Sequence, residues 1–230
     1  MKYKLRAVLY SLAAILAVGS FQAIAASGAS ASVSTPHFGE QLPQNFSFAG
    51  KELAFEASGA SVQCKTVSGS TEISSFSSLG GSLRFQNCAG MISGIPFGNC
   101  TTAGAASGEI LTSRLDDNLV YISSARHEVG MLLFQPQGSP LATFKCGGSE
   151  LKLRGSVLTK ASPLNTWTFS FQLAAKGSKG TQELTQYEGP SGEKLTASLE
   201  ESIVNGAYKS ADLNAVNFEL QATTKTEIIG

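Results

Sequence analysis

The sequence feature that most restricts the fold is a two-residue period of apolar and polar side chains, which returns in short runs along the chain. A period of two is that of a β-strand with one buried face. In the run Thr166–Leu173 we therefore expect every second side chain to point into the core; these are Trp167, Phe169, Phe171 and Leu173. A second run of this kind spans Val216–Ala222.

Further runs support the same fold class. Leu151–Val157 alternates as well, and its Gly155 predicts a bulge or a closely approaching backbone. Val129–Phe134 is apolar at almost every position and predicts a strand that is covered on both faces. Lys194–Glu201 could form a short helix, but no stretch after the N-terminal segment keeps a 3.6-residue period over three turns. Weaker candidate strands are Leu53–Ala57, Ser61–Val67, Ser82–Asn87, Glu109–Ser113, Leu119–Ser123, Thr181–Tyr187, Leu195–Glu201 and Thr224–Ile229.

About a dozen short strands separated by turns predict an all-β fold. We expect an antiparallel β-sandwich of jelly-roll-like type, because so many strands need two layers to bury one face each. Residues 45–230 are expected to form this single domain. Residues 26–44 precede it and are predicted to be a flexible leader, since their first ten positions are almost all Ala, Ser, Gly and Val.

The first 25 residues predict a signal peptide. Lys2, Lys4 and Arg6 precede an apolar segment, Ala7–Val18, and small residues flank a cleavage site between Ala25 and Ala26. A membrane anchor is the alternative, but the apolar segment is shorter than the roughly 20 residues that cross a bilayer. We therefore expect a secreted, extracellular or cell-envelope protein with no membrane anchor after cleavage.

The charge balance excludes some partners. The chain has 17 basic and 17 acidic residues. Removal of the three basic residues of the signal peptide leaves 14 against 17, a net charge of −3. Nucleic-acid binding requires a basic surface, and so does electrostatic attachment to anionic lipid, so neither partner is expected.

The four cysteines predict two disulfides, because their number is even in a chain expected to be exported. They are Cys64, Cys88, Cys100 and Cys146, and three pairings are possible. We favour Cys88–Cys100, which would close a short Gly- and Pro-containing loop, together with Cys64–Cys146. A metal site is the weaker interpretation, since the chain has no C-x-x-C motif and no histidine near the cysteines.

No residue pattern predicts a catalytic, cofactor or metal site. His37 lies in the predicted leader, and His127 lies in a polar segment that we interpret as an exposed turn. Asp116-Asp117-Asn118 lacks the spacing of a calcium loop and is typical of a tight turn. A glycosidase would need two acids across one cleft; the candidates, which we interpret as ordinary surface acids, are Glu109, Glu128, Glu150, Glu183 and Glu219.

Three tyrosines are the candidates for a ligand-binding surface. Tyr121, Tyr187 and Tyr208 lie outside the clearest core runs and could form an aromatic platform. Trp167, the single tryptophan, is expected in the core instead. The segment Ala89–Asn99, closed by the favoured disulfide, could project as a rigid loop.

Several short motifs resemble a group of uncharacterised secreted proteins predicted from actinobacterial genomes. They cover most of residues 60–190, and the resemblance implies export and a disulfide-bonded β-fold without implying an activity. The motifs are V-Q-C at Val62–Cys64, F-Q-N-C at Phe85–Cys88, N-C-T-T at Asn99–Thr102, G-E-I-L-T at Gly108–Thr112, F-K-C at Phe144–Cys146 and L-R-G-S-V at Leu153–Val157.

The sequence thus leads to one functional expectation and two alternatives. We expect a non-catalytic extracellular or cell-envelope protein that acts as a binding module for a polysaccharide or another protein. The first alternative is a glycan-active hydrolase or lyase, which a cleft with two close carboxylates would favour. The second is a secreted inhibitor that uses the Ala89–Asn99 loop, which requires that the loop stands away from the sheet.

Overall fold

The computed structural model describes residues 34–39, 45–57, 60–92, 94–136, 139–203 and 207–230. The predicted signal peptide, its cleavage site at Ala25 and Ala26, and residues 26–33 of the predicted leader lie outside the described residues. Among the residues described, no helix combines the length and the hydropathy that a membrane crossing needs.

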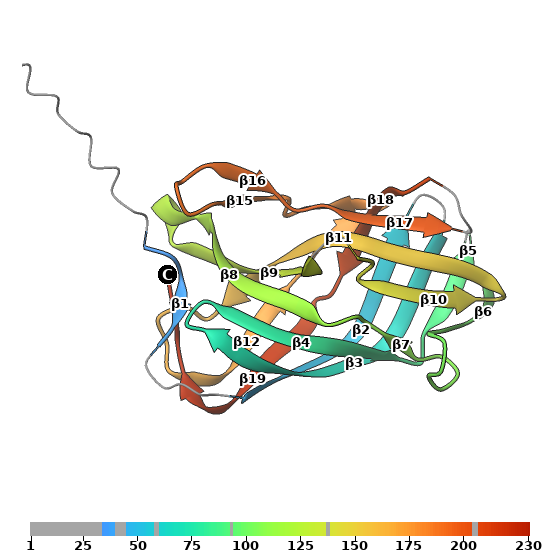
Figure 1. The fold of residues 1–230 in the computed structure, drawn as a ribbon, viewed down its shortest axis with the longest axis horizontal. Helices are drawn as coiled ribbons and strands as arrows, with labels where there is room; N and C mark the ends of the chain where they lie inside the picture. The colour runs from blue at the N-terminus through green and yellow to red at the C-terminus, as the bar shows by residue number, and fades with distance from the viewer. Residues whose placement is uncertain (1–33, 40–44, 58–59, 93, 137–138, 204–206) are drawn as a thin grey trace, which may run out of the picture. The chain divides into compact units, whose positions relative to one another are not determined.

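The described elements are strands and one 3-10 turn, η1, at Ser124–Arg126. Their order is visible in Figure 1. The strands are β1 His37–Phe38, β2 Asn45–Ala57, β3 Ala60–Ser75, β4 Ser78–Gln86, β5 Ala89–Ile92, β6 Ile95–Thr101, β7 Ile110–Leu111, β8 Leu115–Ser123, β9 Glu128–Phe134, β10 Ala142–Cys146, β11 Ser149–Ser162, β12 Thr168–Ala174, β13 Gly177–Ser178, β14 Thr181–Gln182, β15 Gln186–Glu188, β16 Lys194–Thr196, β17 Leu199–Ile203, β18 Lys209–Asn214, β19 Asn217–Thr226 and β20 Ile228–Ile229.

The predicted all-β, antiparallel fold with two disulfides is confirmed. Sixteen strands form one large sheet, and every pairing between named strands is antiparallel. The sheet closes on itself through the neighbours β2–β3–β4–β8–β9–β11–β12–β19, since β19 pairs with β2 again. Around this ring the strands follow chain order, which is a simpler connectivity than the Greek-key order of a jelly roll.

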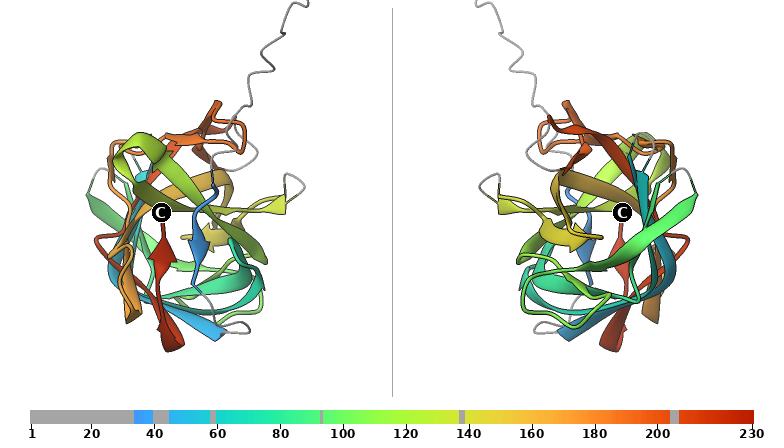
Figure 2. Two further views of the ribbon diagram at one scale, coloured as in Figure 1. Left: turned by 90° about the vertical axis from the view of Figure 1, so that its left-hand side faces the viewer. Right: turned by 90° about the vertical axis from the view of Figure 1, so that its right-hand side faces the viewer.

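A second closed path shares three strands with the first. It runs through β2, β3, β5, β6, β10, β11, β17 and β18. The long strand β2 shows how the two are joined: Phe46–Lys51 pair with β19, and Ala54–Ala57 pair with β18. Strands β2, β3 and β11 therefore run through both rings, and the end-on views of Figure 2 show the strands arranged around the core.

The inward faces of the rings build one hydrophobic core. Six phenylalanines are at most 2% exposed, and Phe48 stacks on Phe218 with ring centroids 5.3 Å apart. Strand β9 was predicted to be covered on both faces, and this is confirmed: Val129, Met131 and Leu133 join the main core, whereas Leu132 joins a second, smaller cluster. The second cluster lies on the opposite face of the same sheet.

The two disulfides are Cys64–Cys88 and Cys100–Cys146, so the pairing favoured from the sequence is wrong. The physical reason is that Cys64 and Cys146 lie on strands that are separated by the segment carrying the other two cysteines. Cys146 is the direct cross-strand partner of Cys100, and the backbone N–H of Cys100 donates to the carbonyl of Cys88. The four cysteines thus lie in the order Cys64, Cys88, Cys100 and Cys146. The first two are bonded to each other, as are the last two, and all four are buried.

Trp167 and Phe169 are exposed, contrary to the prediction that they enter the core. Their exposed fractions are 51% and 50%, whereas Phe171 and Leu173 are fully buried as predicted. The pairing of β12 with β19 shifts register between Thr168 and Ser170. This irregularity turns the start of β12, so that the alternation of the sequence no longer corresponds to one face.

Three other local predictions differ from the structure. Asp116-Asp117-Asn118 is not a turn but the middle of β8, because the surrounding residues alternate as a strand. The domain begins before residue 45, since His37 and Phe38 of the predicted leader pair with β20 and Phe38 is 1% exposed. Lys194–Glu201 contains two strands, β16 and β17, and no helix.

Gly155 occupies a position that no other residue fits, as its place in the alternating run predicted. Its φ is 101°, and a Cβ added there would collide with the carbonyl oxygen of Ser198. We expect Gly155→Ala to lower the free energy of unfolding by about 3 kcal/mol, because both the backbone conformation and this contact oppose a side chain. Urea unfolding followed by fluorescence measures this effect.

Gly148 is the matched control for this substitution. Its φ of 90° is similar, but a Cβ there would meet nothing within 4 Å. Gly148→Ala should therefore cost only the conformational part, about 1 kcal/mol. Equal losses at the two positions would show that the contact with Ser198 does not restrict Gly155.

Candidate functional site

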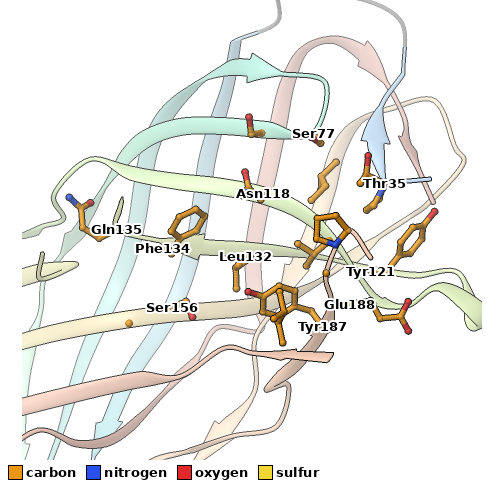
Figure 3. A pocket seen from close by; sticks show the side chains of 18 residues that line it. Thr35, Ser77, Asn118, Tyr121, Leu132, Phe134, Gln135, Ser156, Tyr187 and Glu188 are labelled. Carbon is orange, nitrogen blue, oxygen red and sulfur yellow. The ribbon is translucent and has the colours of Figure 1, made fainter. Parts of the chain in front are cut away.

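A groove on the outer side of the first ring is the best-formed binding site among the described residues. Its volume is about 590 Å³. Figure 3 shows its lining, which comes from segments far apart in the sequence: the residues before β1, the start of β4, strands β8 and β9, the middle of β11, and the hairpin β15–β16. None of these segments forms the groove alone.

The groove exists because β15 replaces β4 beside β8. The pairing of β4 with β8 ends at Ser78 and Asn118, and β15 then pairs with β8 through Glu188 and Tyr121. The hairpin that follows leaves the plane of the sheet and packs against the outer face of β9 and β11. The start of β4 and the hairpin therefore form two opposite walls, and the outward side chains of β8 and β9 form the floor (Figure 3).

The floor is apolar at its centre. Leu132 belongs to the second hydrophobic cluster, and Val120, Phe134 and Tyr187 are partly buried against that cluster. This outer apolar face explains why β9 has no polar side in the sequence. In Figure 3 the rings of Phe134 and Tyr187 lie on either side of Leu132.

The groove also contains an unsatisfied hydrogen-bonding group. The side-chain oxygen Oε1 of Gln135 is buried and has no hydrogen-bond partner among the described residues. An unpaired buried acceptor is costly, about 1–3 kcal/mol in mutational series, and such groups are rare in folded proteins. Asn118 and Ser156 add amide and hydroxyl groups along the same groove (Figure 3).

Tyr187 is the aromatic side chain best placed to contact a ligand. It lies on β15, is partly buried and lines the groove. Burial raises the pKa of its hydroxyl above the ordinary value, so the group stays protonated at neutral pH and can donate a hydrogen bond. The ring and the hydroxyl together offer one apolar surface and one polar group to a ligand.

Glu188 holds the wall of the groove in place. Its carboxylate accepts hydrogen bonds from Lys194 Nζ at 2.8 Å and from the backbone N–H of Ser124 at 3.1 Å. The bond from Lys194, followed by those from Ser124, lowers the pKa of Glu188 to about 2. The group is therefore ionised at neutral pH, and it ties the hairpin to the end of β8.

The three tyrosines proposed from the sequence do not form one platform. Tyr187 and Tyr121 both line the groove, but Tyr121 is only 7% exposed because its strand position faces the main core. Tyr208 is elsewhere, with its ring 3.6 Å from the guanidinium carbon of Arg154. One of the three, Tyr187, thus presents a ring to the groove.

None of the five candidate acids from the sequence lines the groove, and Glu109, which was expected on the surface, is buried with an exposed fraction of 9%. Most of them take part in ion pairs or hydrogen bonds with near neighbours: Glu109 with Arg84, Glu128 with Arg126 and Lys160, Glu150 with Lys152, and Glu219 with Ser170, Gln172 and Gln221. Glu183 is exposed. Among the described lining residues of the groove, Glu188 alone carries a carboxylate.

Neither histidine lines the groove. His127 follows η1 in the left-handed conformation and is exposed, as predicted. His37 lies on β1, and its Nδ1 contacts the carbonyl of Thr35 at 3.1 Å. Within the described part of the chain, no three His, Cys, Asp or Glu side chains gather as a metal site would require.

Three buried acids were not anticipated from the sequence: Asp117, Glu201 and Asp212. Asp212 is 0% exposed, and burial is the first cause that raises its pKa. Asp117 and Glu201 are 1% and 4% exposed, and burial is the main cause that raises the pKa of each to about 7; the neighbouring Asp116 adds to the effect on Asp117. For Asp117 a signal was available, since it shares the alternation of Leu115 and Leu119. Its place in an Asp-Asp-Asn sequence favoured a turn instead.

No family model matches the chain, and no curated protein and no solved structure matches it. The buried disulfides indicate folding in an oxidising compartment.

Proposed function

We propose that this chain is a secreted binding module whose groove accepts a short, neutral segment of an extracellular polysaccharide. The observation that carries the proposal is the meeting, in one groove, of the half-buried ring of Tyr187 with the amide of Asn118 and the hydroxyl of Ser156. A sugar ring has an apolar C–H face that packs on an aromatic ring and hydroxyl groups that donate to an acceptor.

The lining favours a neutral ligand. Glu188 is neutralised by Lys194, and the remaining lining residues are apolar, hydroxyl or amide side chains and glycines. A groove that is mostly apolar with a few polar groups is the usual form of a small-molecule site. Export, predicted from the N-terminal 25 residues, agrees with the disulfides and would bring the groove into contact with extracellular polymers.

The alternatives receive less support. A retaining or inverting glycosidase needs two carboxyl groups at the cleft, whereas the described lining holds one, and that one is occupied by Lys194. The Ala89–Asn99 segment of the inhibitor hypothesis is the hairpin β5–β6, and both of its strands are incorporated in the sheet by pairing with β3 and β10. It therefore lacks the projecting loop on which that hypothesis depended.

We expect Tyr187→Ala to weaken binding of a neutral tetrasaccharide about tenfold, because the aromatic contact of the groove is lost. The measurement is isothermal titration calorimetry of residues 26–230 with gluco-, manno-, xylo- and N-acetylglucosamine tetrasaccharides. Asn118→Leu should weaken binding as well, since it removes an amide group of the groove and keeps a side chain of similar size.

Tyr208→Ala is the matched control, because it removes a tyrosine that lies outside the groove. Circular dichroism melts of all three variants establish that they are folded. Absence of binding to every tetrasaccharide would overturn the proposal, and so would equal affinities of wild type and Tyr187→Ala.

A further inference from the structure

A second surface, formed by residues that do not line the groove, carries polar side chains in regular rows. It is the outer face of five adjacent strands of the first ring, β12, β19, β2, β3 and β4, which lie side by side in Figure 1. Directly paired residues on neighbouring strands have their side chains on the same face, about 5 Å apart. The register of these strands therefore determines which side chains form rows across the face.

One row consists almost wholly of hydroxyl groups. Each member lies directly opposite the next on the neighbouring strand, and the members are Ser170, Gln221, Ser47, Ser70 and Ser82. Ser170 is half-buried and the other four are exposed. The row beside it is formed by Gln172, Glu219, Ala49, Ser68 and Arg84. Because small side chains occupy its centre, the face is flat there.

The polar groups at the β12–β19 end are fixed in position. Glu219 accepts hydrogen bonds from Gln172, from Ser170 Oγ at 3.3 Å and from Gln221 Nε2 at 3.2 Å. These bonds lower the pKa of the Glu219 carboxyl, so the network stays charged and ordered. The amide oxygens of Gln172 and Gln221 are left as acceptors for a ligand.

Two aromatic rings flank this end of the face. Trp167 and Phe169 are half exposed, although the cost of exposing such rings would normally direct them to the core. The ammonium of Lys225 lies 5.7 Å from the centroid of the Phe169 ring. The alternation of the sequence had predicted that both side chains are buried. The shift in register at the start of β12 exposes them instead.

The opposite end of the face is hollowed. A depression of about 440 Å³ is lined by Ser70 and Ser82 of the hydroxyl row together with Glu72 and Arg114. The guanidinium of Arg114 lies over Gly80, where a Cβ would be 2.7 Å from its Nη2. In the described part of the chain Arg114 forms no ion pair, so its donors are available.

We propose that this face binds an extended polysaccharide chain, stacked on Trp167 and Phe169 at one end and held by Arg114 in the depression at the other. A protein partner fits less well, because protein interfaces have apolar centres and contain little serine. A glycan presents a hydroxyl group at regular intervals, which matches a row of hydroxyl and amide groups at strand spacing. The inference concerns residues other than those of the groove and stands independently of it.

Adsorption to an insoluble polysaccharide tests this proposal. Residues 26–230 are mixed with microcrystalline cellulose, with chitin and with purified bacterial cell walls, and the protein left in solution is measured over a range of concentrations. We expect saturable adsorption to at least one polymer, and at least a tenfold weaker apparent affinity for the double variant Trp167→Ala/Phe169→Ala. Ser47→Arg, which raises a long side chain in the middle of the flat row, should weaken adsorption similarly.

Phe76→Ala is the control, because Phe76 has a comparable exposed fraction of 55% and lies in the turn between β3 and β4, outside the two polar rows. Thermal melts establish that each variant is folded, and Ser47→Arg provides a second test if the aromatic double variant is unstable. No saturable adsorption to any polymer, or adsorption unchanged in both platform variants, would overturn the proposal. Failure of tetrasaccharides to bind the groove would leave this result unaffected, since probe and residues differ.

Discussion

Removal of the Cys100–Cys146 disulfide by the double substitution Cys100→Ala/Cys146→Ala is expected to lower the free energy of unfolding by about 4 kcal/mol. The two cysteines are 46 residues apart, and the chain-entropy model gives this value for a loop of that length. Both side chains are fully buried, so loss of the two sulfur atoms also removes packing contacts. Guanidinium unfolding of the oxidised proteins measures the difference.

The same variant distinguishes the observed pairing from the one favoured from the sequence, Cys88–Cys100 with Cys64–Cys146. With Cys64 bonded to Cys88, the remaining cysteines of the variant keep their disulfide and no thiol reacts in the native protein. If instead Cys88 were bonded to Cys100 in the wild type, the variant would leave Cys64 and Cys88 without their native partners. Thiol titration, with a peptide map under non-reducing conditions, distinguishes these outcomes.

Asp117→Asn is expected to stabilise the protein at pH 8, by up to about 4 kcal/mol. Asp117 lies on the inward face of β8 together with Leu115 and Leu119. Burial of its carboxyl raises the pKa to about 7. In the unfolded chain the pKa is about 3.9. The folded state therefore binds a proton between about pH 4 and pH 7 that the unfolded chain has released, and the stability gained from it is present at low pH and lost as the pH rises to 7.

The amide of the variant keeps the size of Asp117 and carries no charge at any pH. Wild-type stability should fall from pH 5 to pH 8, and Asp117→Asn should reduce that slope. Glu201, whose pKa is also raised to about 7 by burial, and Asp212, whose pKa burial raises as well, act in the same direction and contribute to the slope that remains. Asp116→Asn is the control on the neighbouring, half-buried position. A wild-type stability that increases from pH 5 to pH 8 would contradict this account.

Much of the fold follows from local alternation. Phe171, Leu173 and Phe218 are buried as their strand positions predicted, and Gly155 contacts a neighbouring backbone as predicted. A period of two is a local property, and it is reliable wherever a strand keeps one register. At Trp167 it fails, because the register of β12 is imposed by β19, which lies about 50 residues later in the chain.

The candidate site was less accessible to sequence reasoning. Tyr187 was among the predicted ligand contacts, but Asn118 and Ser156 lie in strand runs that carry no local mark of a binding site. The groove is built from segments that the chain order keeps far apart. The predicted cysteine pairing was wrong for the same reason: Cys88 and Cys100 are near in sequence, but Cys100 lies opposite Cys146 on the neighbouring strand, and Cys88 is bonded to Cys64 of β3.

The closed rings also determine how another protein could attach. Partners often add a strand to an exposed sheet edge, which recognises backbone groups with little regard to side chains. In both rings of the described structure each strand is paired on its two sides, and the large sheet ends at the short strand β16, Lys194–Thr196. Among the described residues, the strands of the two rings therefore offer little unpaired backbone to a partner or to a second copy of the chain. Selection among ligands must depend on side chains, and neighbouring copies at high concentration should not join edge to edge into fibres.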